Sequence, residues 1–327
     1  MSYIRNYGSL SDAVRDIYGE ARSVEKRRYV SGGDINEACV LTMDDGSFLF
    51  MKANSAAALS NFKAEADGLR RIRETGAIGV PRVLATGTDE GSSFLLMEYI
   101  IGGRRVSHYW ETFAAELAAM HRADPSGKGG NGPDASGNAK NRADVSRDAK
   151  SGSAVYGNMS YGLEKDNWIG AREQINTPKS SWITFFRDCR LAPQFSSAAR
   201  YFSAEDRKRI DDLLSHLDRF LIEPERPSLV HGDLWSGNMI TGNDGKGWLI
   251  DPAVYYGHPE VDIAMTELFG GFPPAFYDAY EETGMLQPGY EDRRDLYNLY
   301  QLLNHLNMFG SGYLPAVKRI LKRYGGR

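Results

Sequence analysis

The sequence predicts an α+β protein with two lobes, in which a small antiparallel sheet plus helix precedes a larger, mainly helical part. Two observations carry this prediction. Short strand-like runs, separated by turns that contain Gly and Asp, fill the first 99 residues. After Gly102-Gly103, apolar residues recur mainly at helical spacing. We therefore expect an N-terminal lobe at 1–99, a hinge at 100–103 and a C-terminal lobe at 104–327, with enough chain for an ample core.

The elements of the first lobe are predicted from local patterns. Ser9 precedes Leu10, Val14 and Ile17 at helical spacing, which predicts a short capped helix within 9–22. A second helix is expected from Leu59 to about residue 76, because apolar residues recur there every three or four positions. Strands are predicted, in order, at 27–30, 38–43, 47–52, 82–86 and 94–99.

The second lobe is expected to be helical with two exceptions. Trp110, Phe113 and Leu117 mark a long amphipathic helix that runs to about His121. Two short apolar runs, 228–231 and 248–250, are predicted to be strands that flank a loop. The segment 126–153 is rich in Gly, Ser, Asn and charge, so it buries too little apolar surface to offset its ordering entropy. We interpret it as a flexible insertion.

Composition excludes several classes of function. The net charge is -4 and the isoelectric point is near 5.9, so a nucleic-acid partner is not expected. Two cysteines, Cys39 and Cys189, cannot build a disulfide framework. No apolar run approaches the roughly 18 residues that span a membrane, and the first residues lack the apolar core of a signal peptide. These features predict a cytoplasmic protein that acts on a small molecule or on soluble proteins. The oligomeric state is left open, with a monomer among the outcomes.

The strongest chemical signal is the run His231-Gly232-Asp233-Leu234-Trp235-Ser236-Gly237-Asn238, followed thirteen residues later by Asp251. An Asp, an Asn five residues on, and a second Asp after a short strand suit phosphoryl transfer from ATP. Asn238 and Asp251 offer the hard oxygen ligands that Mg²⁺ prefers. Asp233 can accept the proton of an attacking hydroxyl. An ordinary Asp-rich turn explains each residue singly, but not the whole spacing. His231 is expected to be structural.

The first lobe supplies the expected counterparts. Lys52 ends a predicted strand and Glu65 lies on the next helix, which matches a phosphate-binding lysine and the glutamate that orients it. Gly32 and Gly33 lie in a turn whose backbone N–H groups could approach phosphate. Backbone groups of Glu98 and Ile100, just before the glycine pair, are candidates for binding adenine. The chain contains no G-x-x-x-x-G-K-[ST] pattern, which argues against a P-loop enzyme.

These residues together resemble the fructosamine kinase (ketosamine-3-kinase) family, within the protein-kinase-like fold of aminoglycoside phosphotransferases. The pattern H-G-D-x-x-x-x-N is common to many small-molecule kinases, whereas the Trp at position 235 is more specific to this family. The resemblance spans residues 31 to about 270. Its further motifs are the run from Asp251 to His258, Glu260-Val261-Asp262, the run from Asp166 to Gly170, Trp182, Phe185-Phe186 and Arg190-Leu191.

The resemblance implies an ATP- and Mg²⁺-dependent kinase that phosphorylates a ketosamine, free or bound to protein, at its third carbon and so leads to deglycation. It also implies that Asp233 is the base, that Asn238 and Asp251 hold the metal, and that Asp262 braces the catalytic loop. Some family members carry a redox-active Cys in the Gly-rich turn, where this chain has Asp34.

Two residues are candidates for contacting the acceptor. The indole of Trp235 could stack on a sugar ring or its amine substituent. Asp166 could meet a cationic amine, or it could simply cap its own loop. The alternatives for the whole protein are a related kinase for an aminoglycoside, choline or similar alcohol, and a nucleotide-binding protein without activity.

Overall fold

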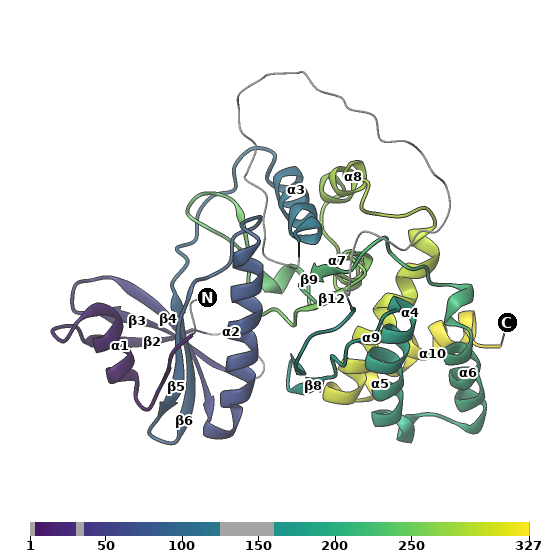
Figure 1. Cartoon of the computed structure of the whole chain (residues 1–327), viewed down its shortest axis with the longest axis horizontal. Coiled ribbons are helices and arrows are strands. Elements are labelled where there is room, and N and C mark those ends of the chain that lie inside the picture. Colours follow the sequence, from purple (N-terminus) through teal and green to yellow (C-terminus); the bar gives the residue numbers. More distant parts are fainter. Residues whose placement is uncertain (1–3, 31–35, 125–159, 327) are drawn as a thin grey trace.

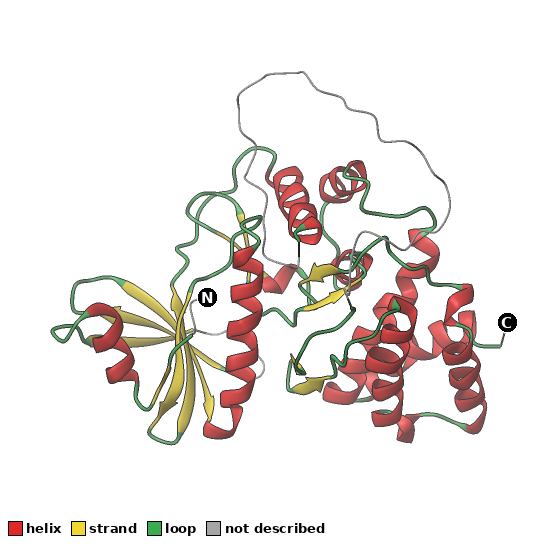
Figure 2. Cartoon of the chain, in the orientation of Figure 1, coloured by secondary structure: helices red, strands yellow, loops and turns green. Residues whose placement is uncertain are grey.

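The computed structural model describes residues 4–30, 36–124 and 160–326. Within them the chain forms two lobes, a β-rich N-terminal lobe and a mainly helical C-terminal lobe (Figure 1, Figure 2). The predicted α+β architecture is therefore confirmed. Gly32, Gly33 and the predicted insertion 126–153 lie outside the described residues.

The N-terminal sheet has six strands in the order β1-β5-β6-β4-β3-β2. All neighbours in it are antiparallel except β1, which pairs parallel to β5 and was not predicted from the sequence. Lys52 lies in the central strand β4, opposite Ala38 on one side and Leu95 on the other. The strands are β1 (Asn6–Tyr7), β2 (Val24–Val30), β3 (Glu37–Met43), β4 (Phe48–Ser55), β5 (Val83–Asp89) and β6 (Ser92–Glu98).

One helix covers each face of this sheet. The helix α1 (Leu10–Tyr18) begins at Ser9, whose hydroxyl accepts a hydrogen bond from the backbone N–H of Asp12, as the capping pattern predicted. The helix α2 (Leu59–Glu74) packs on the opposite face (Figure 1). Alternate residues of β6 belong to the two cores: Leu96 packs with α1 and Leu95 packs with α2.

The C-terminal lobe contains short hairpins as well as helices. Its helices are α3 (Tyr109–Arg122), α4 (Trp182–Phe185), α5 (Ala192–Ser197), α6 (Ala204–Ser215), α7 (Glu260–Leu268), α8 (Pro274–Glu282), α9 (Tyr290–Phe309) and α10 (Leu314–Tyr324). Its strands are β7 (Asn167–Ile169), β8 (Arg172–Gln174), β9 (Ser228–Val230), β10 (Met239–Thr241), β11 (Gly247–Leu249) and β12 (Tyr255–Gly257). Each of β7–β8, β10–β11 and β9–β12 forms a two-stranded antiparallel sheet. The expectation of only two strands in this lobe was therefore wrong, because β7, β8, β10 and β12 were not predicted.

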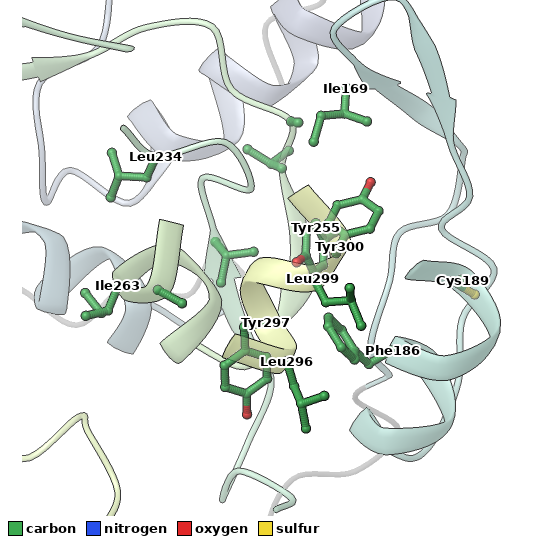
Figure 3. Close-up of a cluster of buried hydrophobic side chains, with 14 of the residues drawn as sticks. Ile169, Phe186, Cys189, Leu234, Tyr255, Ile263, Leu296, Tyr297, Leu299 and Tyr300 are labelled. Atoms are coloured by element: carbon green, nitrogen blue, oxygen red, sulfur yellow. The ribbon is translucent and has the colours of Figure 1, made fainter. Parts of the chain in front are cut away.

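The core of this lobe is organised around α9, which is buried on nearly every side. Figure 3 shows its residues Leu296 and Leu299 between α7, which carries Ile263, and the segment after α4, which carries Phe186. A helix buried all round must satisfy its polar side chains internally. One of these polar residues, Gln301, contacts the loop that forms the candidate site.

The two lobes are joined by backbone hydrogen bonds at two places. Gly103, in the predicted hinge, donates its N–H to the carbonyl of Thr241 at 3.1 Å. On the other side, the carbonyl of Gly79 accepts from the N–H of Leu249 at 2.8 Å. Both C-terminal partners belong to the β10–β11 hairpin, so this hairpin connects the lobes. None of the helices in the described ranges is long and apolar enough to cross a membrane.

Candidate active site

Two antiparallel strand pairs bring the predicted catalytic loop and Asp251 together. In the first, β9 pairs with β12, and the N–H of Ala253 donates to the carbonyl of His231 at 2.9 Å. In the second, β10 pairs with β11, and the N–H of Ile250 donates to the carbonyl of Asn238 at 3.0 Å. Because both strand pairs flank the loop, the backbone brings Asp233, Asn238 and Asp251 to the same end of these pairs.

Asn238 bonds directly to Asp233. Its Nδ2 donates to the Asp233 carboxylate at 3.0 Å and to the Asp233 carbonyl at 2.8 Å. Both amide hydrogens are therefore used, and the Oδ1 of Asn238 is left to coordinate a cation. Asp251 has a positive φ of 56°, a conformation that is uncommon for a residue other than glycine and that is often found at functional sites.

The donor set fits Mg²⁺. No group of three or more His, Cys, Asp and Glu side chains is placed to hold a metal in the part of the chain that the structure describes. Mg²⁺ does not need such a group, because it usually takes one or two protein oxygens and completes its coordination with phosphate and water. The Oδ1 of Asn238 and the carboxylate of Asp251, whose side chain is 42% exposed, offer that kind of incomplete site.

The N-terminal lobe contributes a lysine to the same place. The Nζ of Lys52 donates to Glu65 of α2 at 2.7 Å and also contacts the carboxylate of Asp251. Burial alone would lower the pKa of Lys52, but the charges of Glu65 and Asp251 outweigh it and raise that pKa, so the ammonium is retained. Burial raises the pKa of Glu65. A permanent positive charge thus lies beside the candidate metal ligand.

The carboxyl group of Asp233 is electrostatically perturbed. Burial, together with the negative charges of Asp251 and Asp262, raises its pKa to about 7, although the hydrogen bond from Asn238 acts in the opposite direction. A bound cation would lower this pKa. The ionised form, which such a cation would favour, is the form that accepts a proton as a general base.

The side chains of Asp262 and His231 contact the backbone of the candidate catalytic loop. The carboxylate of Asp262 accepts the backbone N–H groups of His231 at 2.6 Å and Gly232 at 2.9 Å. The ring of His231 lies within hydrogen-bonding distance of the Ile250 carbonyl through Nε2, at 2.9 Å, and its Nδ1 accepts from the N–H of Asp233 at 3.3 Å. Burial lowers the pKa of His231, so the ring is neutral. Both residues therefore contact the backbone of this loop, and their structural roles stay a prediction.

One loop contact was not predicted. Gln301 of α9 donates its Nε2 to the carbonyl of Gly232 at 2.8 Å. Gly232 has a φ of 82°, and a side chain there would approach the Ala253 carbonyl to 2.2 Å, so only glycine fits. The sequence does carry a signal for Gln301, because the polar residues Asn298, Gln301 and Asn304 recur every three positions among the buried Leu and Tyr residues of α9.

The two acceptor candidates differ in their surroundings. The side chain of Trp235 is 37% exposed, and its ring meets Phe269 edge-on with centroids 6.2 Å apart. An exposed aromatic face two residues after Asp233 is available for stacking. Asp166 accepts the N–H of Asn176 at 2.7 Å, which is the loop-capping role that the sequence left open. No recorded contact links Asp166 to Asp233 among the described residues.

The predicted adenine-binding segment lies at the end of β6. The N–H of Glu98 donates to the carbonyl of Arg82 at 3.0 Å, so this donor is already used. The remaining backbone groups of the prediction are the carbonyl of Glu98 and the N–H and carbonyl of Ile100. The structure therefore reduces the candidate adenine-binding groups to these three, and whether they bind adenine stays a prediction.

The two-lobed fold and the paired Lys52 and Asp251 define the class of protein, a phosphotransferase with a protein-kinase-like fold. A macrolide 2'-phosphotransferase of type I shares this fold, with a TM-score of 0.57 and 17% identity over 95% of this chain and 96% of that one. Matches of higher similarity than this one identify the family. The model of the fructosamine kinase family matches residues 7–137 and 133–325, and the chain belongs to this family.

Individual relatives agree with this assignment. A probable ketoamine kinase from Synechocystis is 37% identical over 96% of this chain and 95% of its own length. The chloroplastic protein-ribulosamine 3-kinase of Arabidopsis thaliana is 36% identical over 94% of this chain and 84% of its own length. A solved structure of a candidate fructosamine-3-kinase from Haemophilus somnus has a TM-score of 0.76 and 27% identity, covering 97% of this chain and 96% of that one.

Proposed function

We propose that this enzyme transfers the γ-phosphoryl group of ATP, with Mg²⁺, to the hydroxyl on the third carbon of a ketosamine. The acceptor is a sugar–amine adduct of the fructosamine or ribulosamine type, and phosphorylation leads to its deglycation. Membership of the fructosamine kinase family and the names of the relatives support this acceptor class. The single observation that carries the proposal is the contact of Lys52 with both Glu65 and Asp251, which joins the two lobes at the candidate phosphate site.

Each residue has one task in the proposed reaction. Lys52 binds the α- and β-phosphates, and Glu65 keeps its ammonium in place. Mg²⁺, held by the Oδ1 of Asn238 and the carboxylate of Asp251, would neutralise charge on the β- and γ-phosphates. Asp233 accepts the proton of the attacking hydroxyl. Transfer is direct and in line, without a phosphorylated enzyme, so the protein acts by positioning and by electrostatic stabilisation.

The acceptor is expected to lie against the exposed indole of Trp235. A ketosamine has a polar sugar portion and an amine that carries a positive charge when protonated, and an aromatic face suits both. The position of Trp235 between Asp233 and Asn238 would place the stacked adduct beside the base. An aromatic face would also suit choline or an aminoglycoside, so what favours a ketosamine over these alternatives is the match to the fructosamine kinase family.

A panel of acceptors tests the proposal. The purified enzyme is incubated with Mg-ATP and the fructosamine and ribulosamine adducts of Nα-acetyl-lysine, an aminoglycoside or choline, and products are identified by mass spectrometry. We expect a gain of one phosphoryl group on the lysine adducts only. Robust phosphorylation of the aminoglycoside or choline, with none of the lysine adducts, would transfer the assignment to that acceptor.

Substitution of the base tests the mechanism separately. Asp233→Asn keeps the shape of the side chain but cannot accept the proton, so we expect kcat to fall by about 10²–10⁴-fold. ATP binding, measured by calorimetry, should change little. Asp218→Asn, at an exposed residue of the same lobe, is the matched control and should retain full activity. Wild-type turnover in Asp233→Asn would show that the base is misassigned.

A further inference from the structure

A line of hydrogen-bonded, buried side chains connects three helices to the backbone of the loop that carries Asp233. The hydroxyl of Tyr280, on α8, lies 2.7 Å from Nδ1 of His121, the penultimate residue of α3. The Nε2 of His121 lies 3.1 Å from Oδ2 of Asp262, on α7. All three residues are fully buried. The line ends at the two backbone N–H groups that Asp262 accepts, those of His231 and Gly232.

The direction of each hydrogen bond follows from what the groups can donate. An ionised carboxylate only accepts, so the hydrogen between His121 and Asp262 must belong to Nε2 of the ring. When the ring carries that hydrogen alone, Nδ1 presents a lone pair to which the Tyr280 hydroxyl donates. Burial raises the pKa of Tyr280, so the phenol keeps this hydrogen. In this tautomer every hydrogen bond in the line points toward Asp262.

The carboxylate of Asp262 and the backbone of the candidate catalytic loop constrain each other's position. The two oxygens of its carboxylate accept successive backbone N–H groups. The side chain of Gln301, on α9, donates to the carbonyl of Gly232. The left-handed conformation of Gly232 cannot shift without moving Asp233, which is the next residue. An error of about 1 Å in the position of a catalytic group costs up to about 10²-fold in rate. The orientation of Asp262 is thus coupled to the position of the base.

We propose that Tyr280 and His121 are positioning residues for phosphoryl transfer, because they hold the Asp262 carboxylate in the orientation that fixes the peptide before Asp233. The inference rests on the proposed function for its catalytic consequence. It adds two residues, separated in the sequence from Asp262, that touch neither nucleotide nor acceptor. Their effect is transmitted entirely through the backbone of the catalytic loop.

The decisive variant is Tyr280→Phe, which removes one hydroxyl and leaves the ring packing intact. Its matched control is Tyr277→Phe on the same helix. The hydroxyl of Tyr277 accepts from the N–H of Phe272 at 2.8 Å and lies 3.2 Å from the hydroxyl of Thr266, and it has no part in the line to Asp262. Both variants lose a partly or fully buried hydroxyl, so both should show a similar fall in Tm.

The two variants should differ in activity. We expect Tyr280→Phe to lower kcat by about 3- to 30-fold, a fraction of the loss for a 1 Å displacement, with the KM for ATP changed less than twofold. Tyr277→Phe should keep the wild-type kcat. His121→Gln retains a donor toward Asp262, so it should be more active than His121→Ala. Adding Tyr280→Phe to His121→Gln should cause no further loss, because the hydroxyl no longer has its partner.

Amide hydrogen exchange provides a readout that is independent of the reaction. Tyr280→Phe should raise the exchange rates of the His231 and Gly232 amides at least tenfold, and Tyr277→Phe should not. A wild-type kcat in Tyr280→Phe, or unchanged exchange at these two amides, overturns the proposal. If the wild-type enzyme phosphorylates no ketosamine, the proposed function fails, and the exchange rates alone decide whether Tyr280 holds the loop.

Discussion

Gly68 allows α2 to lie close to the segment that carries Asp251. It is three residues after Glu65, and a side-chain carbon at this position would meet Cγ of Pro252 at 3.3 Å and Cγ2 of Val254 at 3.4 Å. Pro252 directly follows Asp251. Replacing Gly68 should therefore press α2 away from Asp251 and alter the contacts that Lys52 makes with both lobes.

Two opposing terms set the effect of Gly68→Ala on stability. Alanine in a helix interior is favoured over glycine by about 1 kcal/mol. Overpacking a core costs about 1–3 kcal/mol, and a contact of 3.3 Å, which needs a shift of only a few tenths of an ångström, belongs at the lower end. The free energy of unfolding should therefore change by less than about 1 kcal/mol in either direction.

The effect on catalysis should be larger than the effect on stability. If about 1 Å of misplacement costs up to about 10²-fold, a few tenths of an ångström correspond to about two- to fivefold in kcat/KM for ATP. Gly68→Val introduces a larger, β-branched side chain and should lower kcat/KM by about 10- to 100-fold. The loss should appear for ATP and not in the KM of the acceptor, because α2 contributes Glu65.

Steady-state kinetics and urea denaturation of the two variants provide the test. Gly8→Ala is the control, because a side chain there has no neighbour within 4 Å. If Gly68→Ala and Gly68→Val both keep the wild-type kcat/KM for ATP while remaining folded, the close packing of α2 does not govern the Lys52 site, and this reasoning is refuted.

Two further predictions concern buried charge in the C-terminal lobe. Arg190 is fully buried, donates to Asn176 at 2.8 Å and lies 3.9 Å from the ring centre of Tyr255. Arg190→Met should lower the free energy of unfolding in urea by about 3 kcal/mol, because it leaves buried acceptors unpaired, and a loss below about 1 kcal/mol would contradict this. Burial lowers the pKa of His258 to about 4, below its unfolded value of about 6.5, so the unfolded chain binds a proton first and stability falls as pH drops through this interval. His258→Asn, which can still accept from the N–H of Glu260, should remove about 2 kcal/mol of the loss between pH 7 and pH 5, and an unchanged pH dependence would exclude this role.

The local features of the fold were predictable because each depends on neighbours in the sequence. The capped helix at Ser9, the turn at Asp44-Asp45-Gly46 and the helix that carries Glu65 follow from propensity and periodicity alone. Strands of two or three residues were missed, because so few residues carry no periodic signal and only pairing with another strand defines them; these are β1, β7, β8, β10 and β12.

The candidate site was predictable to a lesser degree. The run from His231 to Asn238 predicted the loop, because the candidate base and a candidate metal ligand lie within one short segment. Gln301 and His121 were not identified, although the polar residues of α9 offered a signal. Their partners lie far away in the chain: His121 is 141 residues from Asp262 and 159 from Tyr280. No local pattern specifies which buried polar groups will meet.

The sequence by itself determined the chemistry that this protein can offer: a carboxylate, an amide and a second carboxylate at a spacing suited to phosphoryl transfer, and a lysine and a glutamate in the first lobe. Only the tertiary structure decided that Lys52 reaches Asp251, 199 residues away, and that Asp262 meets His121, which in turn meets Tyr280. The reason is physical. Residue types and their spacing follow from the order of the chain, whereas contacts between distant side chains depend on how helices and hairpins pack to bury their apolar faces and pair their polar groups.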